Sequence, residues 1–203
     1  MIDRIKNILL SPKTEWPKID AEPMTEKGIF LSWVLPLAAI GPVAGLIGQQ
    51  LLGGGSFMGI SWKPSLGFSV SVAVTGYIMS LIGTFLMAKI IDALAPTFGG
   101  VKNPVAALKV VAFSWTAAWL AGIFTLMPSL AILSLLGLYS LYLLYLGLPV
   151  LMKAPSEKAL GYTVVAFLCA IVMFVIISTI TGAVSKALMP EPDLGSITIP
   201  AYQ

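Results

Sequence analysis

Five apolar stretches, each long enough to cross a lipid bilayer as a helix, dominate this sequence. They cover residues 28–52, 66–91, 107–127, 129–152 and 160–185. About 20 apolar residues are needed to span the hydrocarbon core as a helix. The chain is 58% hydrophobic and only 10% charged, whereas soluble domains contain about 25% charged residues. The sequence therefore predicts an all-α membrane protein, a five-transmembrane-helix bundle spanning residues 28–185.

The basic residues predict how the chain is oriented, because loops rich in Lys and Arg stay in the cytoplasm. Two basic residues, Lys63 and Lys186, fall on one side of a five-span arrangement. The others fall on the opposite side: Arg4, Lys6, Lys13, Lys18, Lys27, Lys89, Lys102, Lys109, Lys153 and Lys158. This places the amino terminus in the cytoplasm and the carboxyl terminus outside. Merging the third and fourth spans around Pro128 would give four spans and would divide these loops between the two sides.

Residues 1–27 are expected to form a cytoplasmic arm that contains a short amphipathic interfacial helix. Ile2, Ile5, Ile8 and Leu9 recur at helical spacing, which is typical of a helix lying on a membrane surface. The alternative is a frayed tail. Trp16 is expected to be an interfacial anchor, since Trp is enriched at membrane surfaces. At the other end, residues 186–203 are expected to form an extracytoplasmic tail.

Small residues and prolines mark expected packing and break positions within the spans. Gly41 with Gly45, and Gly76 with Ser80, lie four residues apart, and such spacing lets helix backbones approach closely in lipid. Pro36 and Pro42 predict a bent or broken first span, because each removes a backbone hydrogen bond. The bend could shape the bundle or line a substrate cavity.

The segment "YLLYLGLPVLMKAPSEKALGY" at residues 142–162 contains a second such position. Pro149 frees the carbonyl of Tyr145, and Gly147 loosens the same turn. A freed carbonyl in lipid must find a partner in protein or water. A contact between this end of the fourth span and the arm carrying Trp16 would supply one. An ordinary helix end at the membrane edge is the alternative.

The residues expected to carry chemistry are few. The sequence has no His, and Cys169 is its single Cys, so an intramolecular disulfide is excluded. Acidic and basic residues fall at the ends of the spans or in loops, whereas proton relays and charged-substrate transport need buried ionisable groups. We therefore expect no enzyme activity, no cofactor and no metal site. The net charge of +3 does not indicate a nucleic-acid partner.

Three motifs resemble the YIP (Ypt/Rab-interacting protein) family of membrane proteins. They are "LLSPKTEWPKIDAE" at 9–22, "LPLAAIGPVAGLIG" at 35–48 and the 142–162 segment. The resemblance is closest to short bacterial inner-membrane members, and it implies a five-helix bundle with a cytoplasmic amino terminus. The chain lacks the long cytosolic region and the Asp-Leu-Tyr-Gly-Pro motif of eukaryotic relatives, so a Rab-type GTPase partner is not expected.

Two functions remain open from the sequence. The first is a non-enzymatic membrane protein that works by helix packing and association, as a scaffold, assembly or membrane-organising factor. Its partners would be the lipid bilayer, other membrane proteins or a second copy of itself. The alternative is a small permease or lipid scramblase for neutral or amphipathic substrates, which the two prolines of the first span favour.

Overall fold

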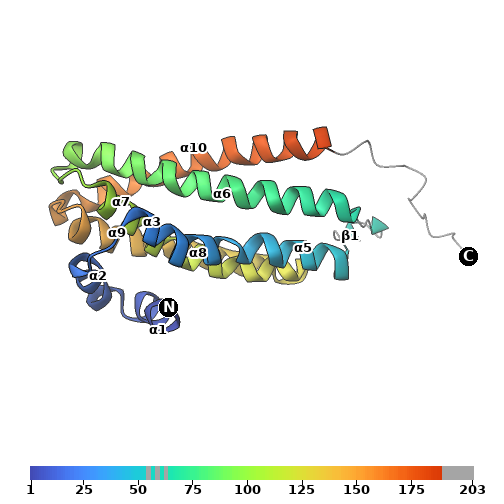
Figure 1. The fold of residues 1–203 in the computed structure, drawn as a ribbon, viewed down its shortest axis with the longest axis horizontal. Helices are drawn as coiled ribbons and strands as arrows, with labels where there is room; N and C mark the ends of the chain where they lie inside the picture. Colours follow the sequence, from blue (N-terminus) through green and yellow to red (C-terminus); the bar gives the residue numbers. More distant parts are fainter. Residues whose placement is uncertain (54–55, 58–59, 62–63, 189–203) are drawn as a thin grey trace, which may run out of the picture.

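The chain forms an elongated helical bundle with a short helical arm beside it (Figure 1). The computed structural model describes residues 1–53, 56–57, 60–61 and 64–188. Five helical segments in this part are long and apolar enough to cross a membrane: Glu26–Leu52, Leu66–Phe98, Pro104–Leu126, Ile132–Leu151 and Ser156–Val184. The predicted all-α, five-helix membrane bundle is therefore confirmed.

Each segment is built from named helices. The arm contains α1 (Ile2–Leu10) and α2 (Pro12–Ala21). The bundle contains α3 (Glu26–Ile29), the π-helix η1 (Phe30–Val34), α4 (Leu35–Ala38), α5 (Ile40–Leu52), α6 (Leu66–Leu94), the 3-10 helix η2 (Ala95–Phe98), α7 (Pro104–Ser114), α8 (Thr116–Ala121), the 3-10 helices η3 (Gly122–Leu126) and η4 (Pro128–Leu138), α9 (Tyr139–Leu151) and α10 (Ser156–Leu188). A two-residue strand pair, β1 (Ser56–Phe57) and β2 (Ile60–Ser61), lies between α5 and α6.

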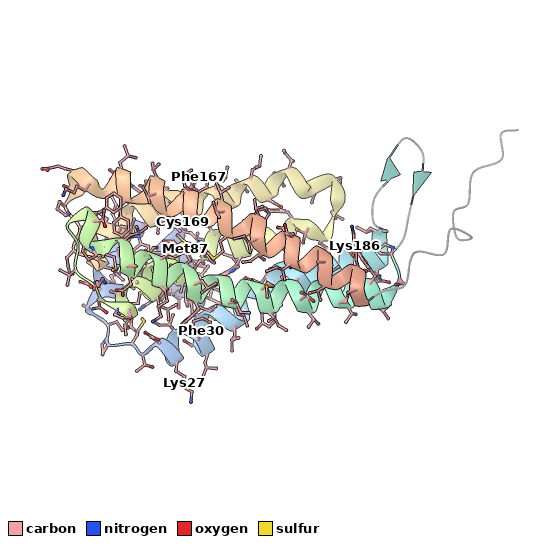
Figure 2. All side chains as sticks on the ribbon, turned by 90° about the horizontal axis from the view of Figure 1, so that it is seen from above. Lys27, Phe30, Met87, Phe167, Cys169 and Lys186 are labelled. Atoms are coloured by element: carbon pink, nitrogen blue, oxygen red, sulfur yellow. The ribbon has the colours of Figure 1, made fainter. Side chains whose placement is uncertain are left out.

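The arm and the end of α10 lie towards opposite ends of the bundle (Figure 1). An odd number of spans requires this arrangement. Large apolar side chains on α10, such as Val172, Phe174 and Val175, are more than half exposed. In a bilayer these side chains would contact lipid. Figure 2 shows side chains projecting outward along the whole length of the bundle. The predicted tail begins at residue 186, and its residues 189–203 lie outside the described residues.

The first span is irregular around its prolines. A π-helical turn, Phe30–Val34, precedes Pro36, and the helix is interrupted at Ala39 between α4 and α5. The hydroxyl of Tyr77 on α6 donates to the carbonyl of Leu35 at 3.1 Å. A neighbouring helix thus supplies a donor to an irregular stretch of backbone, as the low-dielectric lipid environment demands.

The first and third spans cross at glycines. A Cβ on Gly122 would lie 2.8 Å from the Cα of Gly41, and a Cβ on Gly45 would contact Thr125 Oγ1 at 3.6 Å. One turn further, a Cβ on Gly48 would clash with the carbonyl oxygen of Leu126. The α5–η3 contact is therefore a backbone-to-backbone approach that small residues permit.

Replacing Gly48 with alanine should destabilise the bundle, because the new methyl group has only backbone atoms to displace. We expect a loss of about 1–3 kcal/mol, the usual cost of overpacking. Gly76→Ala is the matched control, since a Cβ there meets nothing within 4 Å. The melting temperatures of both variants are measured by thermal unfolding in detergent. Equal melting temperatures would contradict the close crossing of α5 and η3.

The α6–α10 contact is close in one half of its length only. Thr84 and Ala88 of α6 are buried, and a Cβ on Gly83 would lie 2.9 Å from Ile177 Cδ1. Ser80 and Gly76, nearer the start of α6, are only half-buried. The two helices therefore part where the small-residue row continues, and a groove opens between them.

Candidate functional site

Buried and paired polar groups gather at the junction between the arm and the bundle. Ser11 precedes α2, and Pro12 occupies the first position of that helix, where its missing N–H costs nothing. Three apolar side chains of the arm, Ile8, Trp16 and Ile19, have no exposed surface. The arm is thus part of the folded core, because its apolar face packs onto the bundle instead of facing solvent.

Trp16 lies on Gly147 of α9. A Cβ at Gly147 would come within 2.8–3.0 Å of three atoms of the Trp16 ring, so the ring occupies the space that any side chain at this position would need. The same ring and that of Phe113 on α7 form a T-shaped pair at a centroid distance of 6.5 Å. Because Gly147 has no side chain, the Trp16 ring packs directly on the backbone of α9 and holds α2 against this helix.

The sequence prediction of a break at Gly147 and Pro149 needs correction. Helix α9 remains helical through both residues and ends at Leu151, with Met152 as its C-cap. The pair therefore marks the last turns of α9. The donor predicted for the Tyr145 carbonyl stays a prediction. Trp16, expected at the lipid interface, has no exposed surface, so its ring anchors the arm to protein.

Lys109 of α7 binds the end of α2 from inside the bundle. Its side chain is 6% exposed, and Nζ donates to the carbonyls of Glu22 at 2.6 Å, Ile19 at 2.7 Å and Asp20 at 3.4 Å. The last carbonyls of a helix lack internal partners and carry partial negative charge. The ammonium group thus donates hydrogen bonds to these carbonyls, and its positive charge interacts favourably with the negative end of the α2 dipole.

Ion pairs surround this junction. Lys153, just after α9, pairs with Asp20 at 2.6 Å and also donates to the carbonyl of Val150 at 2.7 Å. Lys153 adopts a positive φ of 56°, a conformation that L-residues with a Cβ rarely adopt. The ammonium group of Lys153 thus joins α2 to the end of α9.

A second set of ion pairs joins α1 to α2. Arg4 of α1 lies 3.4 Å from Glu15 and also pairs with Glu22. Glu15 is 2% exposed and pairs with Lys18 at 3.2 Å as well. A further link comes from Tyr139, whose hydroxyl donates to the carbonyl of Leu9 at 2.9 Å. The two arm helices therefore dock as one unit.

The sequence predicted some of the residues of this junction and missed others. Trp16 and Gly147 were singled out, and the structure brings them together. Gly41, Gly45, Pro36 and Pro42 lie instead in the first span. Lys109 was counted only as a loop charge. Its signal was visible as the one basic residue in the run "VAALKVVAF".

The junction consists of apolar contact surfaces and charged side chains that are fixed by ion pairs and hydrogen bonds. Nothing in the described part of the chain brings three or more potential metal ligands together. The arrangement is that of a fixed docking platform, because the charged groups of Arg4, Glu15, Lys109 and Lys153 are each paired with another part of the chain.

Comparison with known families identifies one match. Residues 6–178 match the model of the Yip1 domain, a range that begins in α1 and ends in α10. The search of curated proteins found no match, and neither did the search of solved structures.

Proposed function

Because the chain belongs to the Yip1 family of membrane proteins, we propose that it works by association, as a scaffold, assembly or membrane-organising factor without enzymatic activity. The observation that carries this proposal is the docked arm. It is held by a buried lysine, a buried tryptophan and ion pairs. Because the arm is docked rigidly, its exposed surface has one fixed orientation in which a partner can bind it.

The exposed residues of α1 support an association surface. Ile5, Ile8 and Leu9 pack against the core, whereas Ile2 is 69% and Leu10 is 81% exposed. Lys6 lies among them as an exposed cation. Apolar side chains next to a cation suit insertion into the headgroup region of a leaflet, or contact with an apolar partner. The arm would therefore act at the membrane surface.

The experiment that tests association compares the native protein with an α1 surface variant. The protein is purified in mild detergent, and co-purifying proteins and its own oligomeric state are identified. Ile2→Ser with Leu10→Ser should reduce recovery of the partner or the oligomer, and Lys13→Gln, an exposed change on α2, is the control. A monomer without a partner, combined with transport activity in liposomes, would overturn the proposal.

A small permease or lipid scramblase is the second candidate, and the π-helical turn and interruption around Pro36 favour it. Irregular helices in transporters often line a binding site. The groove beside this region is lined by apolar residues such as Val43, Ile47 and Ile123. Flux of a fluorescent lipid or neutral solute in proteoliposomes decides between the candidates, and flux equal to that of empty liposomes removes this one.

We also propose an orientation, with the arm in the cytoplasm of a bacterial cell and the protein in its inner membrane. The asymmetry of basic residues supports it. A reporter active only in the periplasm should be active when fused after Gln203 and silent when inserted within Ala154–Lys158. The reverse pattern would mean that the protein is inverted.

A further inference from the structure

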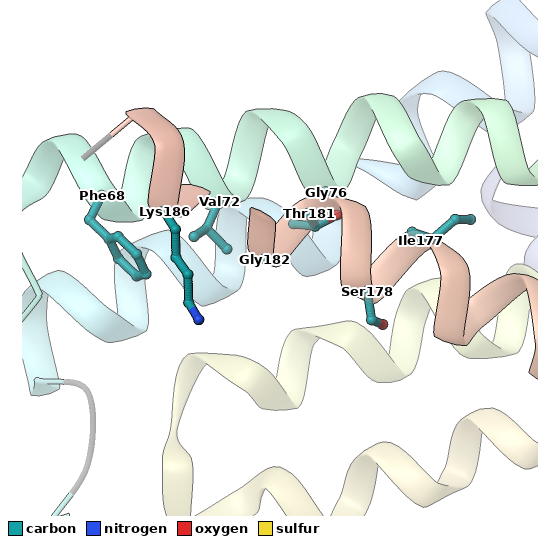
Figure 3. A pocket seen from close by; sticks show the side chains of 8 residues that line it. All are labelled: Phe68, Val72, Gly76, Ile177, Ser178, Thr181, Gly182 and Lys186. Atoms are coloured by element: carbon teal, nitrogen blue, oxygen red, sulfur yellow. The ribbon is translucent and has the colours of Figure 1, made fainter. Parts of the chain in front are cut away.

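A groove runs between α6 and α10 at the end of the bundle away from the arm. Its volume is about 530 Å³, a size typical of small-molecule sites. Eight residues line it: Phe68, Val72, Gly76, Ile177, Ser178, Thr181, Gly182 and Lys186. Figure 3 shows Lys186, Phe68 and Val72 towards one end of the groove, and Ile177 and Ser178 towards the other.

The groove exists because two glycines leave space that packing does not use. A Cβ on Gly76 or on Gly182 would meet nothing within 4 Å. This contrasts with Gly48 and Gly147, where backbone or ring atoms fill the corresponding space. The glycines at 76 and 182 are therefore not required for contact between α6 and α10, and the space is open to an external molecule.

The polar groups of the groove are gathered on α10. Lys186 is exposed near the end of α10 (Figure 2). Thr181 lines the wall, and its hydroxyl is buried without a hydrogen-bond partner among the described residues. The side chains of Phe68, Val72 and Ile177 make the rest apolar. The site thus combines the cation of Lys186, the hydroxyl groups of Ser178 and Thr181, and otherwise apolar side chains.

We propose that this groove binds an anionic phospholipid, with its phosphate at Lys186 and one acyl chain lying along the groove past Gly182 and Gly76. Residues 178–186 extend about 12 Å along a helix, close to the roughly 15 Å half-thickness of a bilayer's hydrocarbon core. A headgroup at Lys186 would therefore send its chain towards the bilayer midplane. The positive charge of the exposed Lys186 side chain complements the phosphate. This inference goes beyond the proposed association and does not depend on it.

The test measures lipid retention by native mass spectrometry. Delipidated protein in nonionic detergent is titrated with phosphatidylglycerol, or with phosphatidylcholine of the same acyl chains. The unmodified protein should hold one phosphatidylglycerol more tightly than phosphatidylcholine. Lys186→Gln should weaken the binding of phosphatidylglycerol roughly fivefold, the value of one lysine near an anionic surface. It should weaken the binding of phosphatidylcholine less, because that headgroup has no net charge. Lys27→Gln, an exposed lysine outside the groove (Figure 2), should change neither lipid.

A second variant separates the acyl site from the charge. Gly182→Leu places a side chain in open space, so the fold should survive, and melting in detergent checks this. Retention of both lipids should fall. Unchanged retention in Gly182→Leu, or an unchanged headgroup preference in Lys186→Gln, would overturn the proposal. So would dissociation of a dimer by Gly182→Leu with lipid retention intact, because a second copy of the chain would then occupy the groove.

Discussion

Replacing Trp16 with alanine should release the arm from the bundle while the five membrane helices stay folded. Removing a fully buried Trp side chain costs about 3–5 kcal/mol, and this ring joins α2 to both α9 and α7 through Gly147 and Phe113. Hydrogen exchange followed by mass spectrometry should show loss of protection in α1 and α2, with α6 and α10 unchanged. Protection retained throughout the arm would mean that Trp16 does not hold it.

A companion substitution makes this test specific to one contact. Gly147→Ala in the native background forces a methyl group against the ring, at an expected cost of about 1–3 kcal/mol. With Trp16→Ala already present, the same methyl group enters a space that the ring has left, so the added cost should disappear. A coupling of about 0.5–3 kcal/mol is typical of residues in contact. Additive effects would contradict the packing of Trp16 on Gly147.

Trp16→Phe probes the polar edge of the same ring. The indole Nε1 is buried without a hydrogen-bond partner among the described residues, and an unsatisfied buried donor costs about 1–3 kcal/mol. Phenylalanine loses contact area but also removes this donor. We therefore expect Trp16→Phe to retain most of the arm's protection, unlike Trp16→Ala.

The sequence was sufficient to predict the membrane bundle, because apolar length and turn residues are local signals. The five-span reading rested on runs of about 20 apolar residues and on the turn at Met127–Ser129, and the structure has five membrane-length helices. The close approach of Gly41 to Gly122 was harder to predict from the sequence. Small-residue spacing indicated which faces pack, but the partner helix depends on how the spans are arranged around one another.

The arm junction could be predicted only in part for the same reason. The sequence suggested that the arm meets the end of the fourth span, and Trp16 does contact Gly147. It did not suggest that Lys109 is buried, because its acceptors lie about 90 residues earlier in the chain. Hydropathy treats a lysine near a span end as a loop charge. Only the folded arm supplies the carbonyls that make its burial favourable.

Lys109→Met should also release the arm, and it tests whether the buried ammonium group stabilises α2. Methionine keeps most of the side-chain volume but donates no hydrogen bond, so the carbonyls of Ile19 and Glu22 lose their partner. Hydrogen bonds to a charged group contribute about 1.5–3 kcal/mol each.

A net loss of about 3 kcal/mol from Lys109→Met would speed hydrogen exchange in α2 roughly 100-fold. Lys102→Met is the matched control, because Lys102 is an exposed lysine just before α7, and it should leave exchange in the arm unchanged. A buried cation that mainly costs desolvation energy predicts the opposite result, since methionine would then stabilise the protein. Slower exchange in Lys109→Met would therefore show that the lysine is kept for a reason other than holding the arm.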